Sequence, residues 1–352
     1  MNTATTVSTA ITFTGHDGSV EAQPGETLLR AGLRAGLPLP YECASGGCGS
    51  CRAQLVEGTV TTLWEDATGL SERDRRRGNR VLMCQSVPDG PCTLKAPRVS
   101  IPEGVDEPTP QRYAARLAGR QLLTTDTALF TIAFDGPLRF LPGQFVLLES
   151  PEGVRRAYSM AHPVRDAGAA TVEFVIRAKP GGAASQWLFG DISLGESLVA
   201  EGPYGRAYAQ PHSGRPVLCI AGGTGLAPIL AITEHLLTAS RPPSLHLYVG
   251  ARTDTDIVLL ERLARLHDMG AELAVSVENP TFSAAALSPG NFPFSPVRVG
   301  RVVDHVADDW PALEGHDIYL AGPAGMVDAA MRALVRGAAA PADRVFFDRF
   351  IA

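Results

Sequence analysis

The sequence contains no long uncharged hydrophobic segment. Its most apolar stretch, residues 217–237, includes three glycines, a proline, a glutamate and a histidine, whereas a membrane-spanning helix needs about 20 apolar residues. The first ten residues carry neither a basic residue nor a hydrophobic run, so the sequence shows no secretory signal. We therefore expect a chain without a membrane segment that acts in the cytoplasm.

Basic residues are also too few for a nucleic-acid-binding protein. The chain has 31 Lys and Arg against 37 Asp and Glu, for a formal net charge of −6. Binding to duplex nucleic acid depends on a concentrated basic surface that neutralises phosphates. We therefore expect no nucleic-acid partner.

Cysteine is rare, but its positions are not scattered. Of six cysteines, only Cys219 lies beyond residue 95. Three of the others form the pattern C-x4-C-x2-C, and a fourth follows far downstream. These four are Cys43, Cys48, Cys51 and Cys84. This spacing is typical of a plant-type 2Fe–2S cluster, whereas the alternative, structural zinc, prefers paired C-x2-C units.

The 352 residues predict two or three domains. Residues 1–95 contain short strands, a short helix and the cysteine loop, and the proline-rich residues 96–112 are expected to be a linker. Short β-type runs in residues 113–210 predict an antiparallel β-barrel. Strands that alternate with helices in residues 211–352 predict a parallel α/β domain. Strands are expected at 11–13, 19–21, 53–57, 130–134, 145–148, 172–176, 217–220, 245–249, 273–277 and 317–320, and a helix at 26–32.

The motif Arg156-Ala157-Tyr158-Ser159 offers three groups that suit a flavin nucleotide. The guanidinium can bind phosphate, the aromatic ring can cover a flavin face, and the hydroxyl can bond to a ring nitrogen. The motif is short, and the alternative is an exposed arginine before a strand.

A second group of residues strengthens the flavin interpretation. Arg177 precedes a Pro-Gly-Gly turn that contains Gly182, and Ser185 lies at the start of an expected helix. We expect Ser185 to cap that helix, so that the helix N-terminus and Arg156 together hold a pyrophosphate.

Two glycine-containing turns follow expected strands of the α/β domain. The first contains Gly222, Gly223, Thr224, Gly225 and Pro228, and the second contains Gly322, Pro323 and Met326. Backbone N–H groups in such a strand–turn–helix arrangement can face a pyrophosphate, although Pro228 stands where the usual dinucleotide motif has its third glycine. The alternative for either turn is a purely structural tight turn.

Together these motifs carry a resemblance to a known family. Residues 1–95, with YECASGGCGSC and LMCQ, resemble the plant-type ferredoxin modules of bacterial oxygenase reductases, and the remainder resembles the ferredoxin–NADP reductase family. The whole chain is similar to the reductase components of bacterial multicomponent ring-hydroxylating oxygenases. This resemblance implies a multidomain α+β and α/β protein with a β-grasp ferredoxin domain, an antiparallel barrel for FAD and a parallel α/β domain for NAD.

The resemblance also implies roles for individual residues. Tyr158 would lie on the isoalloxazine ring and Ser159 would bond to its N5 atom, which makes these two the catalytic candidates. The remaining cofactor-binding candidates are Arg156, Arg177, Gly182 and Ser185 for FAD, with FMN left open; Gly222, Gly223, Thr224, Gly225 and Pro228 for the pyrophosphate of NADH; Gly322, Pro323 and Met326 around the nicotinamide; and Phe350 over the flavin. Phe350 is equally compatible with a core position on the last strand. Many relatives have cysteine where this chain has Ala321.

The implied activity is electron transfer from NADH to FAD, then to the 2Fe–2S cluster, and then to a terminal oxygenase or an intermediate ferredoxin. We expect a monomer that serves a Rieske-type oxygenase of an aromatic-hydroxylating system. A di-iron hydroxylase, a deoxysugar dehydratase and a non-enzymatic electron carrier remain as alternatives. Asp254 and Asp256 would repel a 2′-phosphate, whereas Arg252 would attract one, and on balance we expect NADH as the coenzyme.

One basic run has no role in this scheme. Arg73, Arg75, Arg76, Arg77 and Arg80 fall within eight residues. They are compatible with a solvated helix face, with a docking patch for an acidic redox partner, or with a contact to the chain's own flavin domain.

Overall fold

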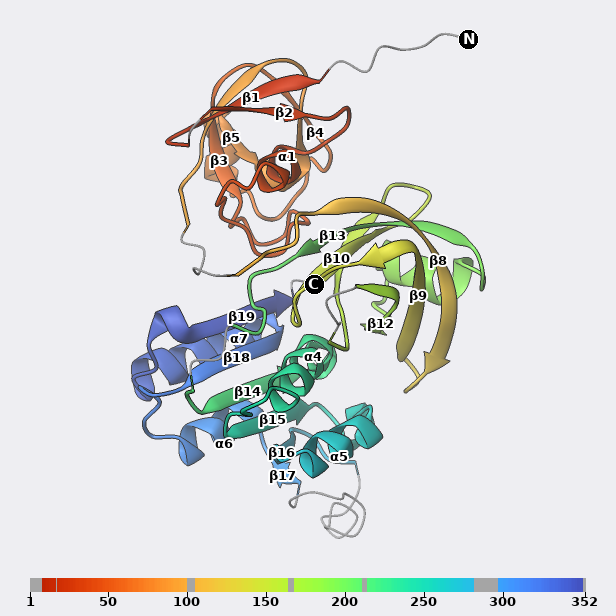
Figure 1. Ribbon diagram of the computed structural model, residues 1–352, viewed down its shortest axis with the longest axis vertical. Helices are drawn as coiled ribbons and strands as arrows, with labels where there is room; N and C mark the ends of the chain where they lie inside the picture. The colour runs from red at the N-terminus through yellow and green to blue at the C-terminus, as the bar shows by residue number, and fades with distance from the viewer. Residues whose placement is uncertain are drawn as a thin grey trace. The chain divides into compact units, whose positions relative to one another are not determined.

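The computed structural model describes residues 8–16, 18–99, 105–163, 168–210, 214–281 and 297–350. The chain divides into two compact units, Met1–Arg112 and Tyr113–Ala352 (Figure 1). Residues 100–104 of the expected linker lie outside the described residues.

The first unit is built on a five-stranded mixed sheet with the order β2-β1-β7-β3-β5. Strands β1 and β7 are parallel and the other neighbours are antiparallel. A second, two-stranded sheet pairs β4 with β6. The elements are β1 (Thr9–Thr14), β2 (Ser19–Ala22), α1 (Leu28–Arg34), β3 (Arg52–Glu57), β4 (Val60–Thr62), α2 (Glu72–Arg77), β5 (Arg80–Leu82), η1 (Met83–Gln85), β6 (Ser86–Pro88) and β7 (Cys92–Lys95). A helix against a mixed sheet of this kind is the expected β-grasp arrangement.

Helix α1 begins two residues later than the sequence pattern predicts. Thr27 is its N-cap, and the Thr27 hydroxyl accepts a hydrogen bond of 3.3 Å from the backbone N–H of Arg30. Glu26 therefore stays outside the helix. Its buried carboxylate accepts hydrogen bonds from the Arg34 guanidinium at the far end of α1 and from the backbone N–H of Gln23.

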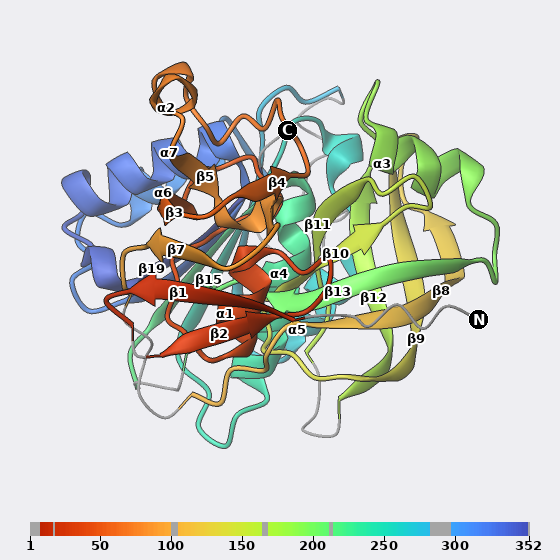
Figure 2. The same cartoon turned by 90° about the horizontal axis from the view of Figure 1, so that it is seen from above.

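The second unit begins with a six-stranded antiparallel sheet of order β11-β10-β13-β8-β9-β12. The sheet curls, because a bridge between Met160 and Phe174 joins the end of β11 to β12 (Figure 2). Alternate residues such as Phe130 and Ile132 fill the interior. The elements are β8 (Gln111–Leu122), β9 (Thr127–Leu138), β10 (Phe145–Glu149), β11 (Arg155–Ser159), β12 (Ala169–Arg177), α3 (Ala183–Gln186), η2 (Trp187–Asp191) and β13 (Ser197–Tyr204). The predicted antiparallel barrel is confirmed.

The remainder of the second unit is a parallel sheet of order β17-β16-β15-β14-β18-β19. Helices α4 and α5 contribute to the core on one face of this sheet, and α6 and α7 to the core on the other. The elements are β14 (Val217–Gly222), η3 (Gly223–Gly225), α4 (Leu226–Leu237), β15 (Leu245–Ala251), η4 (Asp254–Asp256), α5 (Leu260–Asp268), β16 (Glu272–Val277), β17 (Arg298–Val299), α6 (Val302–Asp309), β18 (Asp317–Pro323), α7 (Ala324–Met331), η5 (Arg332–Gly337), η6 (Ala342–Arg344) and β19 (Val345–Phe350).

The order of these strands identifies where a ligand fits. From β14 the chain moves outward through β15, β16 and β17, and it then crosses to the other side of β14 to form β18 and β19. The strand order therefore reverses between β14 and β18. In open parallel sheets, ligands bind at the carboxyl ends of the strands at such a reversal.

Candidate cofactor sites

The four predicted cluster cysteines lie together in the first unit as two pairs. The Sγ atoms of Cys51 and Cys84 are 3.3 Å apart, and the thiols of Cys43 and Cys48 also interact with each other. The backbone N–H groups of Ser45 and Cys48 lie 3.5 Å and 3.4 Å from Cys43 Sγ. The hydrogen bond from the Cys48 thiol and these N–H groups lower the pKa of Cys43 to about 6.

This donor set fits a two-iron cluster. Within the described residues, no three His, Cys, Asp or Glu side chains are grouped to hold one metal ion. A 2Fe–2S cluster makes a different demand, because its four thiolate ligands are shared between two irons that sulfides bridge. Two pairs of cysteines, with backbone N–H groups that point at sulfur, meet that demand.

Glycines let neighbouring segments approach the cysteine loop closely. Gly46 and Gly49 have φ angles of +91° and +78°, which favour glycine. A Cβ on Gly49 would lie 2.5 Å from the carbonyl oxygen of Gly69, and one on Gly46 would lie 3.0 Å from both Trp64 and Gln85. The loop is therefore enclosed by the segment that precedes α2 and by the residue that follows Cys84.

In the barrel, two adjacent arginines of β11 have different surroundings. The buried guanidinium of Arg155 forms ion pairs with Glu201 at 2.7 Å and with Glu149 at 3.3 Å. Arg156 is exposed, and its guanidinium donates a hydrogen bond of 2.8 Å to the carbonyl of Arg155. Arg156 is thus the arginine of this strand that is accessible to a ligand phosphate.

Ser159 ends β11 and contacts the last strand of the chain. Its hydroxyl donates a hydrogen bond of 3.1 Å to the carboxylate of Asp348 in β19. Sequence reasoning did not single out Asp348, because nothing in the local pattern links it to a residue 189 positions earlier. The local signal that could have identified Asp348 is its acidic side chain, two residues before the aromatic residue Phe350.

Two predicted flavin residues have partners within the protein. The capping role predicted for Ser185 is wrong: Gly182 is the N-cap of α3, and Ser185 is the third residue of the helix. Its hydroxyl instead accepts from the backbone N–H of Lys179 at 2.9 Å and lies 2.9 Å from the carbonyl of Gly182. Arg177 forms ion pairs with Asp126 at 2.7 Å and Asp256 at 3.1 Å. Ser185 thus fixes the Pro-Gly-Gly turn, and Arg177 joins the barrel to the parallel sheet.

The two predicted glycine turns meet at the reversal between β14 and β18. A Cβ on Gly225 would lie 2.2 Å from the carbonyl oxygen of Ala321, and one on Gly222 would lie 2.3 Å from Met326 Sδ. Pro228 is the third residue of α4, where a missing N–H breaks no helical hydrogen bond. Gly223 has open space above its Cα, and Thr224 lies beside it in η3.

Strand β19 brings the flavin and nicotinamide candidates into one region. In its parallel pairing with β18, Phe350 lies opposite Pro323, Arg349 opposite Gly322 and Asp348 opposite Ala321. Since Asp348 also accepts the bond from Ser159, the end of the barrel strand β11 lies beside the β18 turn. Phe350 is partly exposed.

The acids expected beside the coenzyme ribose are engaged within the protein. Asp254 is buried and accepts hydrogen bonds from the backbone N–H and the hydroxyl of Thr281. Asp256 pairs with Arg177 and accepts hydrogen bonds from Thr253. Arg252 is exposed.

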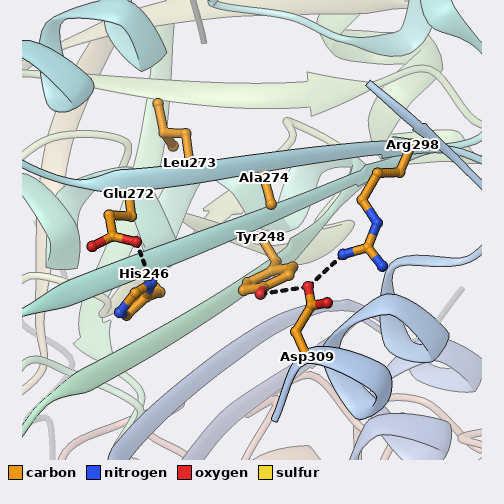
Figure 3. Close-up of a pocket in the computed structure, with 7 residues that line it drawn as sticks. All are labelled: His246, Tyr248, Glu272, Leu273, Ala274, Arg298 and Asp309. Carbon is orange, nitrogen blue, oxygen red and sulfur yellow. Dashed lines mark hydrogen bonds and ion pairs between the residues drawn. The ribbon is translucent and has the colours of Figure 1, made fainter. Parts of the chain in front are cut away.

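A pocket of about 270 Å³ lies elsewhere on the parallel sheet (Figure 3). His246 and Glu272, which line it, lie at the amino ends of β15 and β16, away from the carboxyl ends where the glycine turns meet. Tyr248 donates to Asp309 at 2.8 Å, and Asp309 also pairs with Arg298 (Figure 3). This pocket is separate from the expected coenzyme site.

Comparisons with known proteins agree with this arrangement. The profile of the 2Fe–2S iron-sulfur cluster binding domain matches residues 11–89, that of the oxidoreductase FAD-binding domain residues 114–208, and that of the oxidoreductase NAD-binding domain residues 219–332. In the part of the chain that the structure describes, no helix is long and apolar enough to cross a membrane.

Several known proteins match nearly the whole length of this chain. The ferredoxin–NAD(+) reductase component of the alkene monooxygenase system of Xanthobacter autotrophicus is 40% identical over 337 residues, which cover 96% of this chain and 99% of the relative. A ferredoxin–NAD(P)(+) reductase of Metapseudomonas resinovorans is 38% identical over 329 residues, covering 93% and 95%. The solved structure of the ferredoxin reductase in carbazole 1,9a-dioxygenase matches with a TM-score of 0.83 at 33% identity, covering 98% of each chain. The chain therefore belongs to the family of ferredoxin–NAD(P)+ reductase components of oxygenase systems, and it is an oxidoreductase with a 2Fe–2S cluster, FAD and a nicotinamide coenzyme.

Proposed function

We propose that this protein is the NADH-dependent reductase of a multicomponent oxygenase that hydroxylates aromatic or related hydrocarbon substrates. The observation that carries the proposal is the Ser159–Asp348 hydrogen bond, which links the flavin motif of β11 to the strand paired with the β18 turn. Electrons leave the protein through the 2Fe–2S cluster that the four cysteines of the first unit hold. The protein acts in the cytoplasm and as a monomer.

When bound, FAD accepts a hydride and releases electrons one at a time, and the 2Fe–2S cluster carries single electrons. The residues of the chain position these groups. Arg156 binds the FAD phosphates, Tyr158 covers the isoalloxazine ring, and Ser159 orients N5. The backbone at Gly222, Gly223, Thr224 and Gly225 receives the coenzyme pyrophosphate, Gly322, Pro323 and Met326 surround the nicotinamide, and Phe350 covers the flavin. Arg177, Gly182, Ser185 and Pro228 shape the walls of the two sites.

Tyr158 is suited to contact with an aromatic ring. Its side chain is partly buried, and burial raises the pKa of the phenol well above the ordinary value, while the charge of Arg156 opposes that shift. The phenol is therefore neutral at every physiological pH and acts by packing, not by proton transfer.

The terminal acceptor is a Rieske-type oxygenase or an intermediate ferredoxin. A relative that belongs to a carbazole dioxygenase supports this choice, while a relative from an alkene monooxygenase system supports a monooxygenase as the second candidate. Turnover of NADH with purified terminal components of both kinds tests the proposal, with hydroxylated product as the readout. Product formation that proceeds equally well without this protein would contradict it.

NADH is the proposed coenzyme. The relative that is 40% identical is named for NAD(+), whereas Arg252, the basic residue nearest in sequence to Asp254 and Asp256, could attract a 2′-phosphate. Because the carboxylates of Asp254 and Asp256 already have partners, they repel a 2′-phosphate less strongly than two free carboxylates would. We expect kcat/KM to favour NADH by about tenfold, equivalent to about 1.4 kcal/mol. Steady-state rates with both coenzymes decide this, and a preference for NADPH would show that Arg252 dominates the site.

A further inference from the structure

The basic run of the first unit forms a short helix beside the cysteine loop. Helix α2 (Glu72–Arg77) is capped by Ser71, whose hydroxyl accepts from the backbone N–H of Asp74 at 3.2 Å. Five of the nine Lys and Arg residues of positions 1–95 fall between Arg73 and Arg80. Among these five, Arg75 holds the helix in place, Arg73, Arg76 and Arg77 face solvent, and Arg80 in β5 is half-buried.

Two contacts fix α2 to the segments around the cluster ligands. Arg75 donates hydrogen bonds of 2.6 Å to the carbonyl oxygens of both Glu65 and Ala67. Asp74 pairs at 3.0 Å with Arg52, which also donates to the carbonyl of Gly49 in the cysteine loop. Helix α2 therefore has a defined position next to the loop that carries Cys48 and Cys51.

Three other arginines of the helix point outward. Arg73, Arg76 and Arg77 are exposed, and Arg76 has only a weak ion pair of 3.7 Å with the exposed Glu72 among the contacts described for it. The loop before the helix contributes an exposed apolar side chain, Leu63, which is 50% accessible. Glu65 and Asp66 are also exposed on that loop, so the loop adds acidic and not basic side chains beside the helix.

We propose that the outward face of α2, formed by Arg73, Arg76 and Arg77, is the docking surface for the electron-accepting protein, and that this protein is acidic around its redox centre. This inference rests on the proposed function, since it assumes that electrons leave through the cluster. Electron transfer weakens steeply with distance, so an acceptor must dock beside the cysteine loop, where α2 lies. Opposite charges raise the association rate and orient the encounter, and salt weakens them.

The charge pattern of the whole chain supports a specific role for this face. The protein carries a net charge of −6, so an acidic partner is repelled by the molecule on average. A local group of exposed arginines beside the cluster then selects one orientation of approach. Leu63 provides an apolar contact of the kind found at the centre of protein interfaces.

The probe for the test is the soluble haem domain of cytochrome b5, an acidic protein, with cytochrome c as a basic counterpart. Each NADH that is oxidised to NAD+ releases one proton and two electrons, and these reduce two ferric haems to the ferrous state. A Cys84→Ser variant cannot hold the cluster, so the rate that it retains measures electron transfer that bypasses the cluster. This rate is subtracted from each measured rate. The triple variant R73Q/R76Q/R77Q removes the positive face and keeps good helix-forming residues.

A matched control has the same loss of charge at a different place. Arg241, Arg332 and Arg336 are exposed residues of the parallel-sheet region, and R241Q/R332Q/R336Q lowers the net charge equally. At low ionic strength we expect kcat/KM for cytochrome b5 to fall about tenfold in the α2 variant and less than about twofold in the control. Added salt is expected to slow the wild type much more than the α2 variant. Cytochrome c reduction is expected not to fall in the α2 variant.

Several results would overturn the inference. Equal effects in the two triple variants would show that only net charge matters. An unchanged rate of cytochrome b5 reduction in the α2 variant would show that this surface is not the docking site. Reduction of the cluster by NADH can be monitored through the bleaching of its visible absorption. A slower reduction in the α2 variant would show that α2 contacts the chain's own flavin unit and not the external acceptor. If NADH reduces no cluster in the wild type, the proposed function itself fails. Single Arg73→Gln and Arg77→Gln variants, each expected to lose about twofold to threefold, replace the triple variant if it does not retain iron.

Discussion

The hydroxyl of Ser159 donates a 3.1 Å hydrogen bond to the carboxylate of Asp348, across 189 residues of sequence. The donor ends a strand of the barrel and the acceptor lies on the last strand of the parallel sheet. This bond couples the position of the expected N5 partner to the strand that carries Phe350. Asp348 is therefore a positioning residue for Ser159.

Replacing either partner is expected to slow coenzyme oxidation without releasing FAD. Ser159→Ala removes the hydroxyl proposed to bond to N5, and Asp348→Asn removes the carboxylate charge that accepts the hydrogen bond from this hydroxyl. We expect the rate of flavin reduction by NADH in stopped-flow experiments to fall about tenfold or more in each case. The double variant should be little slower than Ser159→Ala, because the two residues act as one unit. Loss of FAD from either single variant would instead show a binding role.

The two adjacent arginines of β11 provide a matched pair of substitutions. Arg156→Ala is expected to weaken FAD binding at least tenfold, since a charge-assisted contact to phosphate contributes about 1.5–3 kcal/mol. Arg155→Ala is expected to keep FAD but to lower the free energy of unfolding by about 3 kcal/mol, because it leaves the buried Glu201 without its ionic partner. Fluorescence titration of the apoprotein and urea unfolding separate the two effects. Normal FAD affinity in Arg156→Ala would remove that residue from the site.

The cluster is expected to be lost independently of the flavin. Cys51→Ser and Cys84→Ser should each lose iron and inorganic sulfide while they keep FAD, because the cysteines and the barrel lie in different compact units. Cys92→Ser is the control, as Cys92 is a buried cysteine of β7 outside the ligand pattern. Iron, sulfide and flavin contents measure the outcome. Zinc in place of iron and sulfide in the wild type would contradict the cluster assignment.

The division at Arg112 predicts separable half-reactions. A fragment of residues 113–352 contains every candidate residue for FAD and NADH and none of the four cluster cysteines. It should keep NADH-dependent reduction of ferricyanide and lose most reduction of cytochrome c, which depends on the cluster. An equal loss of both activities would show that the second unit does not function without the first.

His316 is expected to make stability depend on pH. Burial and the nearby His246 lower the pKa of His316 below its ordinary value of 6.5, and Asp317 opposes this shift. The unfolded chain then binds the proton at a higher pH than the folded protein does, so this residue reduces stability as the pH falls through 6.5, and the reduction levels off below the folded pKa. Urea midpoints at pH 8 and pH 5.5, followed by tryptophan fluorescence, should differ less in His316→Asn than in the wild type. Equal differences would show that His316 does not contribute.

Features that short segments encode could be predicted from the amino-acid sequence. The C-x4-C-x2-C spacing predicts the cluster because three of its four ligands come from one tight loop, and the structure brings Cys84 to that loop, so that two pairs of cysteines lie together. The glycine turns at Gly222 and Gly322 follow hydrophobic strands, so their place at the carboxyl ends of a parallel sheet was predictable as well. The antiparallel barrel followed from its short β-type runs.

Which polar groups are available to a ligand depends on contacts that form when the chain folds. Ser185 was expected to cap a helix, but the preceding turn supplies Gly182 as the cap, so the hydroxyl bonds to the turn instead. Asp256 was expected to repel a 2′-phosphate, but the fold brings Arg177 to its carboxylate from 79 residues away. The partners of a charged or hydroxyl group are set by chain segments distant in sequence, and local patterns carry no information about them. For this reason the cluster ligands follow from spacing, whereas the Ser159–Asp348 bond and the division of the α2 arginines emerge only when the chain is folded.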